Sequence, residues 1–402
     1  MEKNNKTLNV PNLRFPEFCG EWEKYSLGEV GSTIIGLTYS PSDVVKDGGT
    51  IVLRSSNIQD GEIDYKDLVF VNKKIKDTLY TRPNDLLVCA RNGSARLIGK
   101  NALIAETDSG HTFGAFMMIY RSEDNQFIHQ LLSTKRYYTQ VGENLGARIN
   151  QITTSDMNSF EFYFPKSKSE KDKIAHLLGL INLRISTQKK VIEDLKKLKD
   201  AISKSLFSRY DLLEAKMQIS QIGSLKNGYA FQSSSYDSSG EYEIITIANV
   251  AGERHICTEG CNRIHTLPSD LQPHQELKDG DILISLTGNV GRVSLCKEGK
   301  YLLNQRVGLL QLKAGVNREF VYQALSSRKF ELNMISCGQG AAQMNIGKGD
   351  IESYEIPYSN NPQNLQSVSL ILMSYDKLVL TESTRLQLLL NQKQYIISNM
   401  FI

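Results

Sequence analysis

The sequence predicts an α+β protein in which two globular segments alternate with two long helices that pair as an antiparallel coiled coil. Three observations predict this fold class. Apolar residues recur at helical spacing for about forty residues in two stretches, the second stretch repeats the first 194 positions later, and the segments between them align with each other. The chain is therefore expected to carry an internal pseudo-twofold repeat.

The first long helix is predicted at residues 167–209. It opens with Ser167-Lys168-Ser169-Glu170, a capping-box pattern in which the serine oxygen and the glutamate carboxylate satisfy free backbone N–H groups. About 40 residues at 1.5 Å each span roughly 60 Å, so a narrow apolar stripe of this length needs an equally long partner. The stripe, with two polar members, consists of Ile174, Leu178, Ile181, Ile185, Gln188, Ile192, Leu195, Lys199, Ile202 and Leu206.

The partner is predicted at residues 361–402, where Asn361-Pro362 provides a cap with proline in the first turn. The polar interruptions repeat together with the apolar residues, which argues against two unrelated amphipathic helices on separate cores. Adding 194 to each position of the first stripe gives Val368, Leu372, Tyr375, Val379, Glu382, Leu386, Leu389, Lys393, Ile396 and Met400.

Two globular segments, residues 1–166 and 210–360, complete the predicted division of the chain. Within them, residues 20–165 align piecewise with residues 213–358. Asp85–Arg96 and Asp281–Arg292 both indicate a buried strand followed by a glycine-containing turn that ends in arginine. Further matched pairs are 51–57 with 245–249, 146–152 with 340–346, 156–164 with 350–358, and Phe127–Tyr137 with Phe320–Phe330, the last pair each expected to be one helix.

Length and composition agree with more than one domain. The chain has 402 residues, of which 40% are hydrophobic, enough for sizeable cores. No run of eighteen apolar residues occurs, so no membrane helix or membrane partner is expected. The N-terminal stretch lacks the apolar core of a signal peptide and predicts a cytoplasmic protein. Six cysteines at irregular spacing indicate reduced thiols rather than a disulfide framework.

The net charge of +3 is unevenly placed. Residues 168–209 hold eleven Lys or Arg against five Asp or Glu, so the rest of the chain is slightly acidic. The globular segments are therefore not bulk polyanion binders, and any nucleic-acid contact must come from local clusters or from partners.

Motifs for catalysis are absent from the sequence. No GxGxxG follows a predicted strand, and neither GxxxxGK[ST] nor an Asn/Asp-Pro-Pro-aromatic methyltransferase motif occurs. His255, Cys257, Cys261 and His265 lie close enough in sequence to surround zinc, but their spacing matches no common finger and the first segment has no equivalent. Ordinary thiols and exposed histidines in a hairpin are the favoured interpretation.

Several short stretches together resemble a known family. They are Leu13-Arg-Phe-Pro-Glu-Phe with Trp22, the paired stretches Ile35-Gly-Leu-Thr38 and Asn227-Gly-Tyr-Ala-Phe231, Leu303-Asn-Gln-Arg-Val307, and Gly340-Ala-Ala-Gln-Met-Asn-Ile346. With the alternating architecture, they make the whole chain similar to the specificity subunits of Type I restriction–modification systems. The first segment departs from the pattern at Gly110–Ala115, where Phe-Gly-Ala stands in place of Asn-Gln-Arg.

The resemblance implies a non-catalytic DNA-binding subunit. Each globular segment would be a target-recognition domain that reads half of an asymmetric, bipartite site in double-stranded DNA. The implied partners are two adenine methyltransferase subunits docked on the helices, and motor-nuclease subunits for restriction. No cofactor is expected on this chain, because S-adenosylmethionine, ATP and Mg would be held by those partners.

Candidate DNA contacts are polar, basic or aromatic residues in or beside predicted turns, since Arg suits guanine edges and Asn or Gln suit adenine edges. In the first segment they are Tyr39, Arg54, Arg91, Asn92, Arg96, Arg148 and Gln151. In the second they are Tyr229, Thr287, Asn289, Arg292, Asn304, Gln305, Arg306 and Gln343. For Asn57, Asn249 and Arg306 a structural role, bonding loop backbone, is the alternative.

A second function stays open on sequence grounds. It is a non-enzymatic coiled-coil scaffold whose duplicated globular segments bind proteins or glycans, and the lack of a strongly basic patch favours it. Against it, the helices carry the positive charge, and docked subunits could supply the remaining phosphate contacts.

Overall fold

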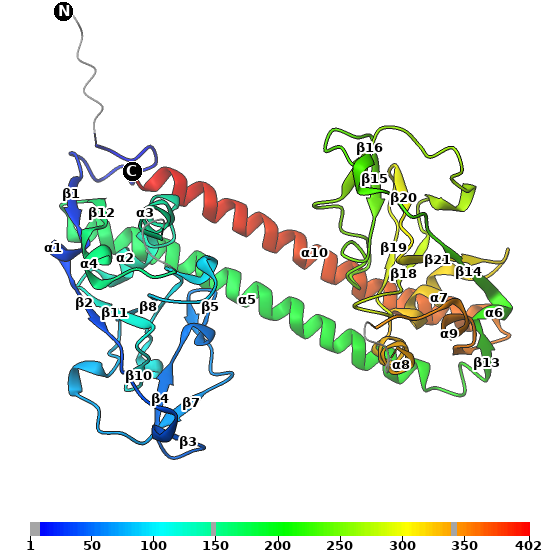
Figure 1. Ribbon diagram of the computed structural model, residues 1–402, viewed down its shortest axis with the longest axis horizontal. Helices are drawn as coiled ribbons and strands as arrows, with labels where there is room; N and C mark the ends of the chain where they lie inside the picture. The colour runs from blue at the N-terminus through cyan, green and yellow to red at the C-terminus, as the bar shows by residue number, and fades with distance from the viewer. Residues whose placement is uncertain (1–8, 146–149, 339–343) are drawn as a thin grey trace, which may run out of the picture. The chain divides into compact units, whose positions relative to one another are not determined.

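The computed structural model describes residues 9–145, 150–338 and 344–402. Their contacts form two compact units: unit 1 extends to Lys189 and also includes Arg385–Ile402, and unit 2 is Lys190–Thr384. The long helices α5 (Lys168–Phe207) and α10 (Pro362–Met400) contribute to both units (Figure 1). The predicted α+β fold, with its paired long helices and internal repeat, is confirmed. No helix in the described ranges has the length and apolar character needed to cross a membrane.

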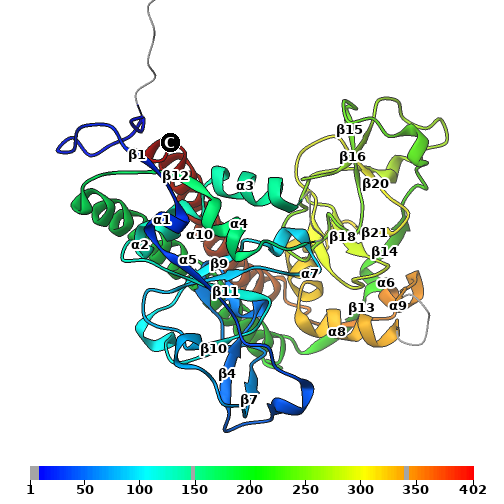
Figure 2. The same ribbon diagram turned by 60° about the vertical axis from the view of Figure 1, so that its left-hand side comes forward.

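Unit 1 is built on two four-stranded sheets. One is antiparallel, in the order β2 (Ser32–Ile35), β11 (Met117–Arg121), β8 (Leu86–Cys89), β9 (Asn101–Leu103). The other has the order β10 (Thr112–Phe113), β4 (Thr50–Leu53), β7 (Val69–Val71), β3 (Val44–Val45), with β10 and β4 parallel. Figure 2 shows the second sheet on the side of the first that faces away from α3 (Lys135–Leu145) and α4 (Thr154–Ser159).

Smaller elements complete unit 1. Strands β1 (Glu23–Ser26) and β12 (Glu161–Phe164) pair beside α1 (Leu27–Val30), and β5 (Ile58–Gln59) pairs with β6 (Glu62–Ile63). The largest core includes Trp22, Tyr120 and Phe127, the last on α2 (Asn125–Leu131). Apolar strand residues that alternate between the two faces of the first sheet fill this core and a second one between the sheets.

Unit 2 repeats this plan. Its antiparallel sheet has the order β14 (Gly223–Asn227), β21 (Val307–Leu312), β18 (Ile282–Ser285), β19 (Val293–Leu295). The other sheet is β16 (Asn262–Ile264), β15 (Tyr242–Ile245), β20 (Tyr301–Leu303), β17 (Glu276–Leu277), and its parallel pair β15–β20 corresponds to β4–β10. The remaining elements are β13 (Ala215–Gln218) paired with β22 (Glu355–Tyr358), α6 (Ile219–Ile222), α7 (Arg318–Leu325), α8 (Arg328–Cys337) and α9 (Lys348–Glu352).

The predicted stripes form the seam of the long helices, because all ten positions of each stripe are buried or half-buried. In unit 1, Ile174 and Leu178 near the start of α5 share a core with Ile397 and Met400 at the end of α10. In unit 2, Leu206 near the end of α5 shares a core with Leu372 of α10. Within each unit the two helices therefore run antiparallel.

Two local predictions are wrong. A single helix was expected at 127–137 and another at 320–330. Each of these ranges instead contains parts of two helices, α2 and α3 in unit 1 and α7 and α8 in unit 2. Hydroxyl groups cause the break: Thr134 Oγ1 and Ser327 Oγ accept the backbone N–H groups of Tyr137 and Phe330, which starts a new helix.

The capping box at the start of α5 is only half formed. Ser167 Oγ accepts the Glu170 N–H as predicted. The Glu170 carboxylate instead accepts two bonds of 2.8 Å from the Arg14 guanidinium and one of 3.2 Å from the Trp22 indole. This buried acid therefore ties the N-terminal Leu13–Trp22 stretch to the helix rather than capping it.

Candidate nucleic-acid interface

Three segments that adjoin strands of the antiparallel sheet and a fourth that lies between two helices converge in each unit, and we call them the four-segment surface. In unit 1 they are residues 36–39, 90–92, 114–116 and 150–152, and in unit 2 residues 228–231, 286–289, 304–306 and 344–346. Isolated β-bridges join them: Leu37–Gly114 and Arg91–Gln151 in unit 1 match Tyr229–Asn304 and Thr287–Asn345 in unit 2. The same frame is thus built twice.

A glycine in each unit makes the frame possible. A Cβ on Gly36 would lie 2.1 Å from the carbonyl oxygen of Gly114, and a Cβ on Gly228 would lie 2.2 Å from that of Asn304. No side chain fits at such distances. Only glycine therefore lets the segment after β2 pass this close to Gly114, and the segment after β14 pass this close to Asn304. This explains the paired glycine-containing stretches in the sequence.

Arg54 and Tyr39 border a cavity of about 740 Å³ in unit 1. The Arg54 Nη2 donates to the backbone oxygen of Asp67 at 2.7 Å and to its carboxylate at 2.8 Å. These two bonds hold the Arg54 guanidinium beside the cavity.

Arg91 and Phe116 stand together on the four-segment surface of unit 1. Both side chains are exposed, and the Arg91 guanidinium carbon lies 5.1 Å from the centroid of the Phe116 ring. The Asn92 side chain already makes two hydrogen bonds within the protein, since its Nδ2 donates to Ser55 and its Oδ1 accepts the Ser94 N–H. Sequence reasoning missed Phe116, because nothing in the sequence separates an exposed aromatic residue from a core one.

In unit 2 the predicted residues are held in different ways. The Tyr229 hydroxyl donates to Asp270 at 2.8 Å, which raises the pKa of Tyr229, and its ring packs 4.9 Å from that of Phe231. Asn304 is buried and accepts the Arg306 backbone N–H, while the side chains of Gln305 and Arg306 are exposed. Exposed Asn289 and half-buried Thr287 lie in the segment after β18.

The β-ladders correct two pairings that the sequence comparison made between the segments. The bridges align Tyr229 with Leu37 and Phe231 with Tyr39, as the paired glycine-containing stretches predict, so Tyr39 and Tyr229 are not counterparts. They also align Asn304-Gln-Arg306 with Gly114-Ala-Phe116, one residue later than the sequence comparison placed it. Gln151 corresponds to Asn345, as the alignment of 146–152 with 340–346 predicts, although Asn345 was not among the candidate contacts.

The other correction concerns Arg96 and Arg292. The Cys89 N–H donates to the Lys100 carbonyl as the Ser285 N–H does to that of Arg292, so Arg292 is the counterpart of Lys100. Arg96 lies in a longer turn of unit 1 and is exposed, whereas the Arg292 Nε lies 3.7 Å from the Glu331 carboxylate. Two further predicted residues, Arg148 and Gln343, lie outside the described residues.

Asn57 and Asn249 have the structural role given as the alternative. The Asn57 amide bonds the backbone of Arg54, Asp64 and Lys66. The Asn249 amide likewise accepts the Thr246 N–H and donates to the Cys257 carbonyl. Both side chains fold a loop and are unavailable to a ligand.

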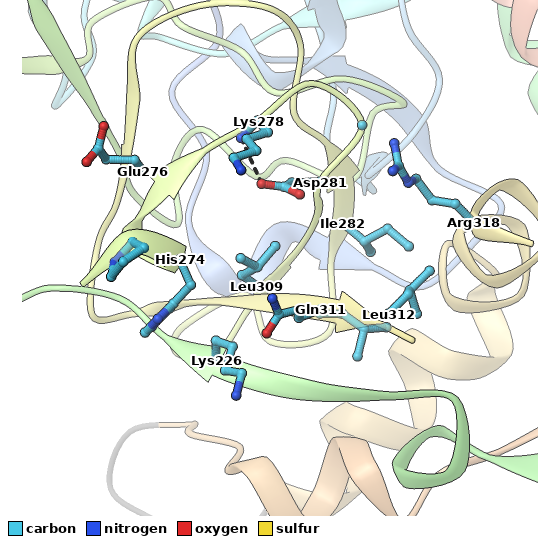
Figure 3. Close-up of a pocket in the computed structure, with 13 residues that line it drawn as sticks. Lys226, His274, Glu276, Lys278, Asp281, Ile282, Leu309, Gln311, Leu312 and Arg318 are labelled. Carbon is cyan, nitrogen blue, oxygen red and sulfur yellow. Dashed lines mark hydrogen bonds between the residues drawn. The ribbon is translucent and has the colours of Figure 1, made fainter. Parts of the chain in front are cut away.

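Other candidate sites lie apart from the four-segment surface. Figure 3 shows a hollow of about 420 Å³ beside β14, β18 and β21, where burial raises the pKa of Asp281 and the Lys278 N–H donates to its carboxylate at 2.8 Å. None of the residues lining it is a predicted DNA contact. Among the described residues, no three His, Cys, Asp or Glu side chains gather as a metal site, and His265 pairs with Asp237.

Comparison with known proteins finds Type I specificity subunits among the relatives of this chain. Residues 214–391 match the model of the Type I restriction modification DNA specificity domain. The chain is 24% identical over 365 residues to the Type I restriction enzyme EcoKI specificity subunit of Escherichia coli (strain K12), covering 83% of this chain and 77% of that protein. The chain is therefore similar to Type I specificity subunits over most of its length.

Two further subunits of this kind agree. The StySPI specificity subunit of Salmonella potsdam is 25% identical over 192 residues, which cover 45% of this chain and 41% of that protein. The crystal structure of the S subunit from M. genitalium matches 98% of this chain and 99% of its own with a TM-score of 0.60 at 16% identity. That structural match shows the shared fold.

Proposed function

We propose that this chain is a specificity subunit and recognises an asymmetric, bipartite DNA site, with one half-site read by the four-segment surface of each unit. The observation that carries the proposal is the repeated frame with different side chains at equivalent positions. Arg91 of unit 1 is equivalent in position to Thr287 of unit 2, Gln151 to Asn345, and Phe116 to Arg306. A shared frame places both surfaces alike on their own half-site, while unlike side chains select unlike bases.

The candidate base contacts are residues of the four-segment surfaces, together with Arg54 on the cavity beside the surface of unit 1. In unit 1 we assign Arg54, Arg91, Gln151 and Tyr39, together with Arg148 on sequence grounds alone, and in unit 2 Gln305, Arg306 and Asn289. Arginine donates two bonds to guanine O6 and N7, and glutamine or asparagine matches the adenine edge. We assign phosphate contacts to Arg96, Arg292 and the lysines near them. Such contacts fix the position of the protein on DNA without selecting sequence.

The subunit is non-catalytic, and its partners perform the chemistry. We propose two methyltransferase subunits and, for restriction, motor-nuclease subunits, so that S-adenosylmethionine, ATP and Mg are bound only by these partners. The basic residues of α5 add phosphate contacts or docking contacts, as the net positive charge of residues 168–209 suggests. Because its substrate is cellular and incoming DNA, we place the complex in the cytoplasm. No specific observation favours the alternative of a protein- or glycan-binding scaffold.

The test is methylome sequencing of cells that express this chain together with its methyltransferase subunit. We expect methylated adenines in one bipartite motif with two different halves and an unspecified gap, and none when this chain is omitted. Methylation that is independent of the chain, or that follows one uninterrupted motif, would refute the proposal. The purified chain alone is expected neither to bind S-adenosylmethionine nor to methylate DNA.

A further inference from the structure

Phe116 is a large aromatic side chain that unit 1 leaves on its four-segment surface. It is 59% exposed, although a phenylalanine gains roughly 1.5–3 kcal/mol from full burial. Its backbone is fixed, because its carbonyl oxygen accepts the N–H groups of Ala90 at 2.9 Å and Arg91 at 3.0 Å. The exposed ring is therefore mounted on a rigid turn rather than on a loose loop.

The surroundings of Phe116 combine apolar area with guanidinium groups. The ring borders the 740 Å³ cavity, whose apolar walls include Leu37, Tyr39 and Val44. Arg54 lies on the wall of the same cavity, and the Arg91 guanidinium lies over the ring. A ligand here meets an apolar surface flanked by two groups that suit guanine or phosphate oxygens.

Unit 2 carries a different chemistry at the equivalent position. The matching β-bridges align Phe116 with Arg306, which is also exposed. Proteins read guanine in the major groove with arginine, and they read thymine through apolar contact with its 5-methyl group. The same place in the frame thus offers the two units contacts for two different bases.

We propose that Phe116 specifies a thymine in the half-site read by unit 1, by packing its ring against the 5-methyl group. Arg306 occupies the same position toward a guanine in unit 2. The inference rests on the proposed function, since it names a base for one position of a site that the chain must first be shown to read.

The first test compares methylomes of four variants, each co-expressed with the methyltransferase subunit. Phe116→Ala is expected to accept any base at one thymine position of one half-site and to leave the other half-site unchanged. Phe116→Leu keeps an apolar side chain and should keep the thymine. Phe116→Arg should shift the preference at that position toward guanine. Arg306→Ala should relax one guanine in the opposite half-site.

The second test removes the methyl group from the DNA instead of the ring from the protein. Each thymine of the half-site is replaced in turn by uracil, and binding of the chain with its methyltransferase subunit is measured. At one position the wild-type complex should bind about fourfold more weakly, the loss that corresponds to one buried methyl group. Phe116→Ala should show no further loss at that position, because the contact is already absent.

The outcomes separate this inference from the proposed function. If the wild-type chain directs no bipartite methylation, the proposed function fails. If it directs such methylation but Phe116→Ala reads an unchanged motif, or all uracil-substituted sites bind wild type as tightly as thymine, only the inference fails. If Phe116→Ala does not fold, the uracil series on the wild-type complex still decides.

Discussion

Lys199 of α5 and Asp376 of α10 form an ion pair at 2.5 Å, with both side chains largely withdrawn from solvent. Asp376 also accepts bonds from Arg254 at 2.9 Å and from Gln323 of α7 at 2.6 Å, and Glu319 binds the other side of the Arg254 guanidinium. One carboxylate thus joins both long helices, α7 and the loop after β15 within unit 2. Lys199, one of the two polar positions of the first stripe, is the residue by which α5 takes part in this network.

Asp376→Asn should destabilise unit 2, because Lys199 and Arg254 would then share a mostly buried space with one fewer negative charge. We expect a loss of about 3 kcal/mol in the free energy of unfolding, measured by urea denaturation. Asp172→Asn, an exposed acid on the same α5 that pairs with Lys168, is the matched control and should change stability by less than about 0.5 kcal/mol. Equal effects would mean that the network does not hold unit 2 together.

The seam of the long helices can be tested with two leucines of one helix. Leu178 is fully buried and Leu180 is 51% exposed. Leu178→Ala should cost about 2–5 kcal/mol through lost burial and the cavity left behind. Leu180→Ala should cost less than about 0.5 kcal/mol. Thermal and urea unfolding of both variants would contradict the pairing if the two losses were similar.

Gly228→Ala should damage the four-segment surface of unit 2, because the new Cβ would overlap the carbonyl of Asn304. Overpacking of this kind costs about 1–3 kcal/mol and should displace Asn304-Gln-Arg306. We expect weaker recognition of one half-site in the methylome. Gly179→Ala in α5 is the control, since its Cβ would meet open space and alanine favours the helix by about 0.5–1 kcal/mol. Normal reading by Gly228→Ala would refute the role of this close approach.

His129 should make unit 1 sensitive to acid. Burial, and to a smaller extent the charge of Lys393, lowers the pKa of His129 from 6.5 to about 4. Between these values the unfolded chain binds a proton that the folded chain does not, so stability falls as the pH falls from 6.5 toward 4. His129 lines a cavity of about 370 Å³, which Asp60, Glu62 and the exposed His176 also border.

The measurement is the free energy of unfolding at pH 7 and at pH 5. His129→Gln should lose less stability over this range than the wild type does. His176→Gln removes a neighbouring histidine from the same cavity and should keep the wild-type difference. If both variants match the wild type, His129 does not contribute to the acid sensitivity.

The long helices could be predicted because their stability depends on a repeating pattern that the sequence displays. Each stripe position is buried or half-buried, and Asn361 Oδ1 accepts the Gln363 N–H at the predicted start of α10. The strands could be predicted equally well, since Leu86–Cys89 and Ile282–Ser285 are mainly apolar runs that are buried on both faces.

The turns were less predictable, because backbone length between two strands follows no hydrophobic pattern. The segment that joins β8 to β9 is longer than its counterpart between β18 and β19, which is why Arg96 was matched to Arg292. The role of Glu170 depended on Arg14, a residue 156 positions away. Long-range ionic contacts of this kind leave no local signal.

The most direct test of the central claim, one half-site per unit, uses the repeat itself. In a chimera, residues 213–358 replace residues 20–165, so that both units carry the four-segment surface of unit 2. Methylome sequencing with the methyltransferase subunit should then find a motif made of two copies of the half-site that unit 2 reads. Retention of the original asymmetric motif by the folded chimera would contradict the account.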